Sequence, residues 1–111
     1  MILLSAGCSQ SNESKVLGTW MAKTSNDIDQ KEMLIYYKFF ENGIVSIRTR
    51  SVDKENESRP RIKMIGKYKF EKDNENITFH WDDGHSETMK FVFPETNKMI
   101  LGKYEMEKTD R

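Results

Sequence analysis

Arg61-Ile62-Lys63-Met64-Ile65-Gly66-Lys67-Tyr68-Lys69-Phe70, followed by Ile77-Thr78-Phe79-His80-Trp81, is the stretch that decides the fold. In the first run, residues 62, 64, 66, 68 and 70 lie on one face and lysines occupy most of the other, with Ile65 as the exception. The second run alternates in the same way. A side-chain period of two is typical of a β-strand with one buried face. The polar segment 73–76 between the runs therefore predicts a β-hairpin whose apolar face other strands must cover.

The rest of the chain divides into further short strands. They are expected at residues 16–22, 32–40, 44–50, 87–93 and 98–106. Asn42-Gly43 and Asp82-Asp83-Gly84 are tight-turn sequences, and the charged segment 53–60, which ends in a proline, is expected to be a mobile loop. We expect an all-β, antiparallel up-and-down meander of about seven strands and no helix. Closure into a small barrel or half-barrel would remove the exposed strand edges.

Composition limits the kind of partner. The 111 residues suffice for one domain, and 18 basic and 18 acidic residues give no net charge, which argues against nucleic-acid binding. Locally, residues 59–72 hold six basic residues and one acid (+5), whereas residues 73–87 hold five acids and no Lys or Arg (−5). Opposite charges on adjacent strands predict stabilising cross-strand pairs. The alternative is a dipole that binds a partner.

The N-terminal residues carry the most specific motif. Leu4-Ser5-Ala6-Gly7-Cys8 resembles a bacterial lipobox, and a polar run follows it. The resemblance implies acylation of Cys8, a membrane anchor, and a place in the bacterial cell envelope, facing the periplasm or the exterior. Residues 1–8 would be a signal-peptide remnant, 9–15 a flexible tether and 16–111 the folded domain. The alternative is a free cysteine in a disordered leader.

The single cysteine and the short length of the apolar runs exclude two kinds of structural feature. Cys8 is the only cysteine, which rules out an intrachain disulfide and a metal site built on several thiolates. No run approaches 18 apolar residues, so no transmembrane helix is expected.

Gly18-Thr19-Trp20, on the first expected strand, resembles the Gly-x-Trp motif of lipocalins and of small lipocalin-like domains in bacterial lipoproteins. The runs 39–43, 66–68 and 77–79 fit the same family pattern. The resemblance implies a barrel or half-barrel, a possible apolar cleft and no common enzymatic activity. It also implies that Trp20 closes one end of the barrel.

A Gly-Lys-Tyr sequence occurs twice in the chain, as Gly66-Lys67-Tyr68 and as Gly102-Lys103-Tyr104. Glycine within a strand marks a sharp bend or the close approach of a ring to the backbone. We expect both glycines to lie at such positions.

Potential metal ligands gather at the hairpin that contains His80, Asp82, Asp83 and His85. Two imidazoles and a carboxylate, from His80, His85 and Asp82, could converge on a metal ion. Asp-Asp-Gly also occurs in turns for backbone reasons alone. Catalysis needs a positioned nucleophile, and the one cysteine is expected to be acylated. We therefore predict no enzymatic activity and no cofactor.

The aromatic run at 36–40 leaves two interpretations open. One strand cannot place both of its faces inside a barrel, so either Tyr37 and Phe39 or Tyr36 and Phe40 lie outside. Outward aromatic residues beside arginines would suit a protein contact. The candidate contact residues for a partner or ligand are Trp20, Tyr36, Tyr37, Arg48, Arg50, Tyr68 and Trp81.

These observations favour a lipid-anchored protein that acts by binding. The first hypothesis is a protein-interaction module of the cell envelope, such as an inhibitor, an immunity protein or an assembly factor. The second is a carrier of a small apolar ligand inside the barrel. The third is a metal-binding or hydrolytic site between His80 and His85.

Overall fold

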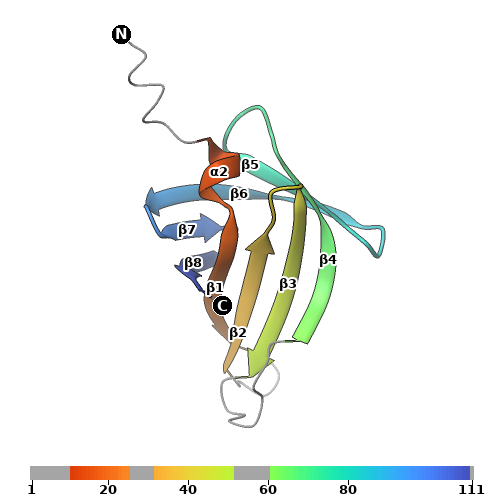
Figure 1. Ribbon diagram of the computed structural model, residues 1–111, viewed down its shortest axis with the longest axis vertical. Coiled ribbons are helices and arrows are strands. Elements are labelled where there is room, and N and C mark those ends of the chain that lie inside the picture. Colours follow the sequence, from red (N-terminus) through yellow and green to blue (C-terminus); the bar gives the residue numbers. More distant parts are fainter. Residues whose placement is uncertain (1–10, 26–31, 52–60, 111) are drawn as a thin grey trace.

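The computed structural model describes residues 11–25, 32–51 and 61–110, and these form one closed antiparallel barrel (Figure 1). The strands are β1 (Gly18–Ser25), β2 (Glu32–Phe39), β3 (Ile44–Ser51), β4 (Arg61–Phe70), β5 (Asn76–Trp81), β6 (Ser86–Glu95), β7 (Lys98–Leu101) and β8 (Tyr104–Thr109). A single helical turn, α2 (Asn12–Lys15), precedes them. The prediction of an all-β barrel is confirmed. The expected loop at 53–60 lies outside the described residues.

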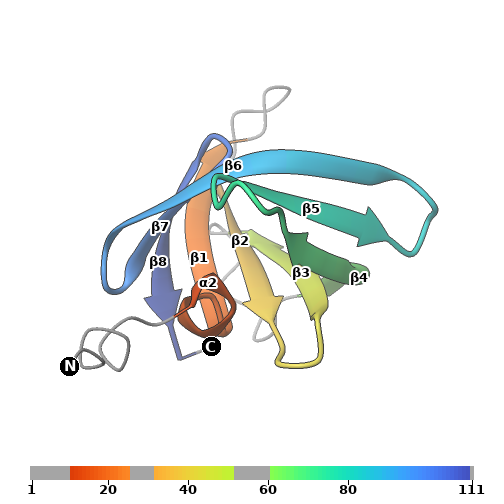
Figure 2. The same cartoon turned by 90° about the horizontal axis from the view of Figure 1, so that it is seen from above.

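Each strand pairs with the next one along the chain, and β8 returns to pair with β1. Seen from above, the strands follow one another around the barrel (Figure 2). β1 and β2 pair over eight residues, whereas the closing contact between β1 and β8 spans three, from Thr19↔Thr109 to Met21↔Glu107. Because every strand has two neighbours, the sheet has no unpaired edge.

The strand count corrects the sequence prediction from seven to eight. The segment expected as one strand at 98–106 is a hairpin, in which Leu101 pairs with Tyr104 across a turn at Gly102 and Lys103. Gly102 has a φ of +60°, a backbone conformation that glycine adopts without strain. Alternating apolar residues continue on both sides of this turn, so the pattern alone did not reveal it.

The helical turn α2 corrects the prediction that the chain has no helix, and it occupies residues 12–15 of the segment expected to be a flexible tether; residues 9 and 10 lie outside the described residues. The Ser11 side chain caps the helix by accepting a hydrogen bond from the Ser14 amide at 3.2 Å. Glu13 lies in the first turn and Lys15 in the last, as the helix dipole favours. The chain is therefore ordered from α2 into β1. Among the described residues, no helix has the length and apolar character needed to cross a membrane.

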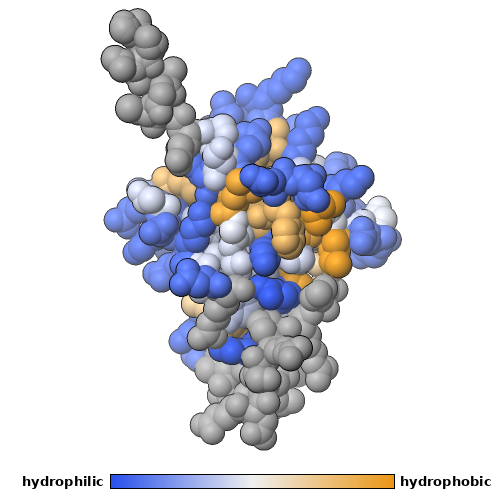
Figure 3. All heavy atoms as spheres, viewed as in Figure 1, coloured by the Kyte–Doolittle hydropathy of each residue, from blue (hydrophilic) through white to orange (hydrophobic). Residues whose placement is uncertain are grey.

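The period-two pattern correctly identified the core. Inward-facing side chains of the strands form one cluster, and polar side chains cover most of the visible outer surface (Figure 3). Burial of each large apolar side chain contributes about 1.5–3 kcal/mol, so this cluster is the main source of stability. The buried members are Val16, Trp20, Ala22, Ile35, Tyr37, Phe39, Val45, Ile47, Ile77, Phe79, Trp81, Phe91, Met99, Leu101 and Met106.

The expected pairing of opposite charges between β4 and β5 is wrong. In the register of these strands, Lys67 lies opposite His80 and Lys69 lies opposite Thr78. The acids of this region lie in the turns beside β5, apart from Glu87, which follows on β6. The net charge of a segment does not show which of its residues lie opposite each other on paired strands.

Candidate functional site

The two ends of the barrel differ, and the difference locates the candidate site. We call the end that carries α2 and the β2–β3 turn the closed end (Figure 1). We call the other end, with the β5–β6 turn at 82–85 and the β7–β8 turn at 102–103, the open end.

Trp20 fills the closed end. Its side chain is fully buried, and its indole Nε1 donates a hydrogen bond to the Val16 carbonyl oxygen at 2.8 Å. The Phe93 ring centroid lies 5.9 Å from the Trp20 ring, and the Lys108 ammonium lies 5.3 Å from it. A Cβ on Gly18 would lie 3.0 Å from Lys108 Cε, so glycine leaves room for the lysine. The prediction that Trp20 is a core residue is confirmed.

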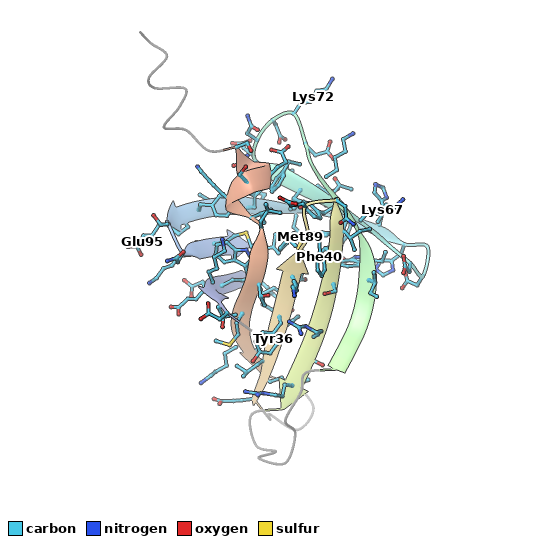
Figure 4. All side chains as sticks on the ribbon, in the orientation of Figure 1. Tyr36, Phe40, Lys67, Lys72, Met89 and Glu95 are labelled. Carbon is cyan, nitrogen blue, oxygen red and sulfur yellow. The ribbon has the colours of Figure 1, made fainter. Side chains whose placement is uncertain are left out.

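A cleft of about 550 Å³ occupies the interior at the open end. Strands from all around the barrel contribute to its walls, and most of the lining side chains are apolar or aromatic. They are Ile35, Tyr37, Ile47, Met64, Trp81, Glu87, Met89, Lys103 and Tyr104, with Gly102 at the rim turn. Met89, labelled in Figure 4, comes from β6.

Trp81 forms a rigid aromatic wall of this cleft. It stacks on Phe79 with ring centroids 5.1 Å apart and planes 8° from parallel. The backbone of Gly66 also approaches Trp81 closely, since a Cβ on Gly66 would lie 2.8 Å from Trp81 Cε3 and 2.5 Å from the His80 carbonyl oxygen. The predicted packing of a ring over Gly66 is confirmed. Gly102 instead lies in a turn, beside Met89.

Four polar side chains line this cleft: Tyr37, Tyr104, Glu87 and, at the rim, Lys103. The two tyrosine rings lie 6.5 Å apart. Burial raises the pKa of the Tyr37 hydroxyl well above its usual value, and the nearby Tyr104 and Glu87 raise it further. Tyr37 therefore stays protonated at neutral pH. The Glu87 side chain is about one third exposed (37%), and its Oε2 lies 3.8 Å from His85 Nε2.

Tyr68, another predicted contact residue, lies toward the closed end. Its hydroxyl donates a hydrogen bond to the Phe40 carbonyl oxygen at 2.8 Å, and its ring meets Phe39 edge-on at 5.0 Å. It also lines a second cleft, of about 600 Å³, beside α2 at the closed end. Three charged residues, Glu13, Glu41 and Lys69, line that cleft as well, so its lining is less apolar than that of the cleft at the open end.

The hairpin proposed as a metal site forms other contacts. His80 faces outward, as expected, and its Nδ1 lies 2.8 Å from Ser86 Oγ. His85 Nδ1 lies 2.5 Å from Asp83 Oδ1, which also accepts a hydrogen bond from the His85 amide. Both contacts with His85 lower the pKa of Asp83. Within residues 11–25, 32–51 and 61–110, no three His, Cys, Asp or Glu side chains are grouped to hold a metal, so Asp82 does not complete a site.

The structure decides between the two faces of β2. Tyr37 and Phe39 face the core, whereas Tyr36 and Phe40 face outward. Tyr36 is nevertheless fully buried, with the Arg48 guanidinium 5.7 Å from its ring, so it offers no free surface. Arg50 lies opposite Leu34 and is half-buried. Cys8 lies outside the described residues.

Sequence reasoning missed Glu87, Met89 and Tyr104 as candidate site residues. A signal was present, because residues 87, 89, 91 and 93 share one face of the expected strand. Glu87 would lie on the same strand face as Met89 and two phenylalanines. Such a carboxylate is unusual on a buried face, where acidic residues are rare unless they are paired.

No protein-family model, no curated protein and no solved structure matches the chain. The lipocalin and lipoprotein resemblances therefore rest on the sequence motifs alone. The closed barrel and its interior cleft rest on the structure.

Proposed function

We propose that this protein is a binding protein that holds a small, largely apolar ligand inside the open end of its barrel. The observation that carries the proposal is the cleft of about 550 Å³, lined mainly by apolar and aromatic side chains, with the polar groups of Tyr37, Glu87, Lys103 and Tyr104 among them. Ligand sites in proteins typically have volumes of about 300–1,000 Å³ and this mixture of walls. Barrels of about eight strands are just wide enough to hold one small ligand.

This proposal changes the order of the hypotheses drawn from the sequence. The protein-interaction module relied on outward aromatic residues, and one of the two on β2's outer face, Tyr36, is fully buried. The carrier hypothesis relied on space inside the barrel, and the cleft provides it. Its polar groups suit hydrogen bonding and charge pairing with a bound molecule, so we propose binding without chemical conversion.

Fluorescence of N-phenyl-1-naphthylamine, a neutral apolar probe, tests the interior site. We expect the probe to bind with micromolar affinity, about −8 kcal/mol, and to gain intensity as it leaves water. Met64→Trp should fill the cleft and abolish the signal, because Met64 lines its wall. Ile65→Trp is the matched control, since Ile65 is the next residue of β4 but faces outward with 40% exposure.

Two results would overturn the interior site. One is the absence of probe binding to the wild-type protein. The other is equal loss of binding in Met64→Trp and Ile65→Trp while both variants keep the wild-type melting temperature. Retention by Ile65→Trp together with loss in Met64→Trp supports the site.

A second candidate, protein contact, is favoured by an exposed apolar pair on the outer surface. Phe40 and Ile65 are 38% and 40% exposed, and the lysines Lys38 and Lys67 lie beside them on the same face. Apolar side chains are visible among polar ones over this face in Figure 3, and Figure 4 labels Phe40 and Lys67. Purification of a tagged protein from its host's envelope extract tests this candidate. A genuine partner should be lost with Phe40→Ser and retained with Met64→Trp.

The lipid anchor on Cys8 is a separate part of the proposal, supported by the lipobox-like sequence 4–8. It would hold the barrel at the membrane of a bacterial cell envelope. Mass spectrometry of the N-terminal peptide from host membranes should show acyl groups on Cys8. An unmodified thiol there would remove the anchor from the proposal and leave the interior site untouched.

A further inference from the structure

We propose that the interior site selects ligands that carry an alkylammonium group, which Glu87 would pair with while aromatic rings surround it. This inference rests on the proposed interior site and names the chemical class of its ligand. Its support is the arrangement of charge and aromatic rings in the open end.

The first step of the argument is the orientation of Glu87. It lies opposite Phe79 in the register of β5 and β6, and Phe79 is a fully buried core residue. Side chains directly opposite each other on adjacent strands lie on the same face of a sheet. Glu87 therefore faces the interior, in agreement with its place in the lining of the cleft.

The second step is the charge balance of the site. Glu87 is the one carboxylate among the residues that line the interior cleft. Its Oε2 lies 3.8 Å from His85 Nε2, which is beyond hydrogen-bond distance. A partly buried carboxylate in the lining of an apolar cleft attracts a cation, and a bound ligand that displaces water from the cleft strengthens this Coulomb attraction.

The third step is the aromatic walls. Tyr37, Tyr104 and Trp81 line the same cleft as Glu87. The faces of aromatic rings attract cations, and such rings are the usual surroundings of quaternary ammonium groups in proteins. Their combination with a carboxylate suits a positive group on an apolar body better than it suits a neutral lipid.

Lys103 is the feature that could favour an anion instead. It is an exposed residue of the β7–β8 turn, at the rim of the cleft. Its ammonium lies 5.6 Å from the Tyr104 ring, so this ring interacts with a cation. Lysine on a flexible stem can move into water, whereas Glu87 is held on a strand.

Three ligands with the same eight-carbon chain test this inference: octyltrimethylammonium, 1-octanol and octanoate. Displacement of N-phenyl-1-naphthylamine measures their affinities for the full chain. We expect octyltrimethylammonium to bind about tenfold more tightly than 1-octanol and octanoate to bind most weakly. Glu87→Gln should reduce the ratio between the first two to about one, and Glu87→Lys should reverse the preference toward octanoate. Glu105→Gln, an exposed glutamate on β8, is the control that keeps the wild-type order.

The outcomes separate this inference from the proposed function. If the probe itself fails to bind, the interior site is wrong. If the probe binds but octyltrimethylammonium shows no advantage, or keeps its advantage in both Glu87 variants, the ammonium preference is wrong and the interior site stands. A preference of the wild-type protein for octanoate would overturn the inference and point to Lys103.

Discussion

The closed and open ends of the barrel contain similar residues but differ in packing. At the closed end, Trp20 is fully buried and its indole nitrogen has a hydrogen-bond partner. At the open end, Trp81 is also buried, at 4% exposure, yet it forms the wall of a cleft. One tryptophan fills space and the other borders it. Under the proposed function, the closed end stabilises the barrel and the open end binds the ligand.

Backbone geometry explains why the two ends differ. The chain enters the closed end through α2 and places Val16, fully buried, against the base of the barrel. The described connections at the open end are the short turns at 82–85 and 102–103, which stay at the rim. The closed end is therefore packed by residues that precede β1, whereas the turn at 102–103 at the open end borders the cleft.

Trp20→Ala should have the largest effect, because it removes the side chain that fills the closed end. We expect the free energy of unfolding to fall by about 3–5 kcal/mol, as for other buried tryptophans. Urea denaturation monitored by circular dichroism measures it. Trp20→Phe keeps an aromatic ring but loses the hydrogen bond to Val16, so its free energy of unfolding should lie between those of the wild type and Trp20→Ala. A loss below about 1 kcal/mol for Trp20→Ala would contradict the assignment of stability to this end.

Gly66→Ala should have the next largest effect, since it pushes a methyl group against the wall of the open end. The new Cβ would lie 2.5 Å from the His80 carbonyl oxygen and 2.8 Å from Trp81 Cε3. Overpacking of this kind costs about 1–3 kcal/mol. The variant should also displace Trp81 and weaken probe binding, which separates it from Trp20→Ala. Lys67→Ala, at the next and outward-facing position, is the control; equal losses in both variants would argue against the close contact.

The sequence predicted the barrel because its strands are short, alternating and separated by strong turn residues. Residues 61–81 show this most clearly, and every inward position expected there from Met64 onward is observed to face the core. The turn at Gly102 was missed because alternation continues through it. The helical turn α2 was missed because four polar residues carry no apolar period, and only the Ser11 cap marks its start.

The candidate site was harder to predict than the fold. Trp81 and Tyr37 were named as contact residues, but a ring in the core and a ring lining a cleft have the same sequence pattern. Whether space remains inside depends on how residues from five or more strands pack together, and no local pattern records that. Tyr36 shows a different limit of the sequence pattern, because a side chain that faces outward on a strand is not always exposed to solvent.

Tyr37→Phe should change how the stability of the protein depends on pH, which tests the burial of Tyr37 at the open end. The folded-state pKa of Tyr37 lies above its usual value, mainly through burial. The unfolded chain therefore loses this proton first as the pH rises, and the stability that is present below about pH 10 is lost above it. Wild-type stability should fall about 1.4 kcal/mol more per pH unit above about pH 10 than that of Tyr37→Phe. Urea denaturation between about pH 9 and about pH 11 measures the two slopes.

The pKa of Tyr68 is also raised by burial, but Tyr68 is present in both proteins and its contribution cancels from the comparison. Parallel slopes for wild type and Tyr37→Phe would mean that the Tyr37 hydroxyl is well solvated. The cleft would then be open to water to a greater depth than its lining indicates.

Met89→Ala should have the smallest effect on stability of these changes. Met89 is only partly buried at the rim of the cleft, so its removal enlarges an existing space and leaves no sealed cavity. We expect a loss of about 1 kcal/mol, well below the cost at a closed core position. The same variant should admit a bulkier probe, which a comparison of naphthyl and pyrenyl amines would show. A loss as large as that of Trp20→Ala would mean that the open end is packed like the closed one, and the contrast between the two ends would fail.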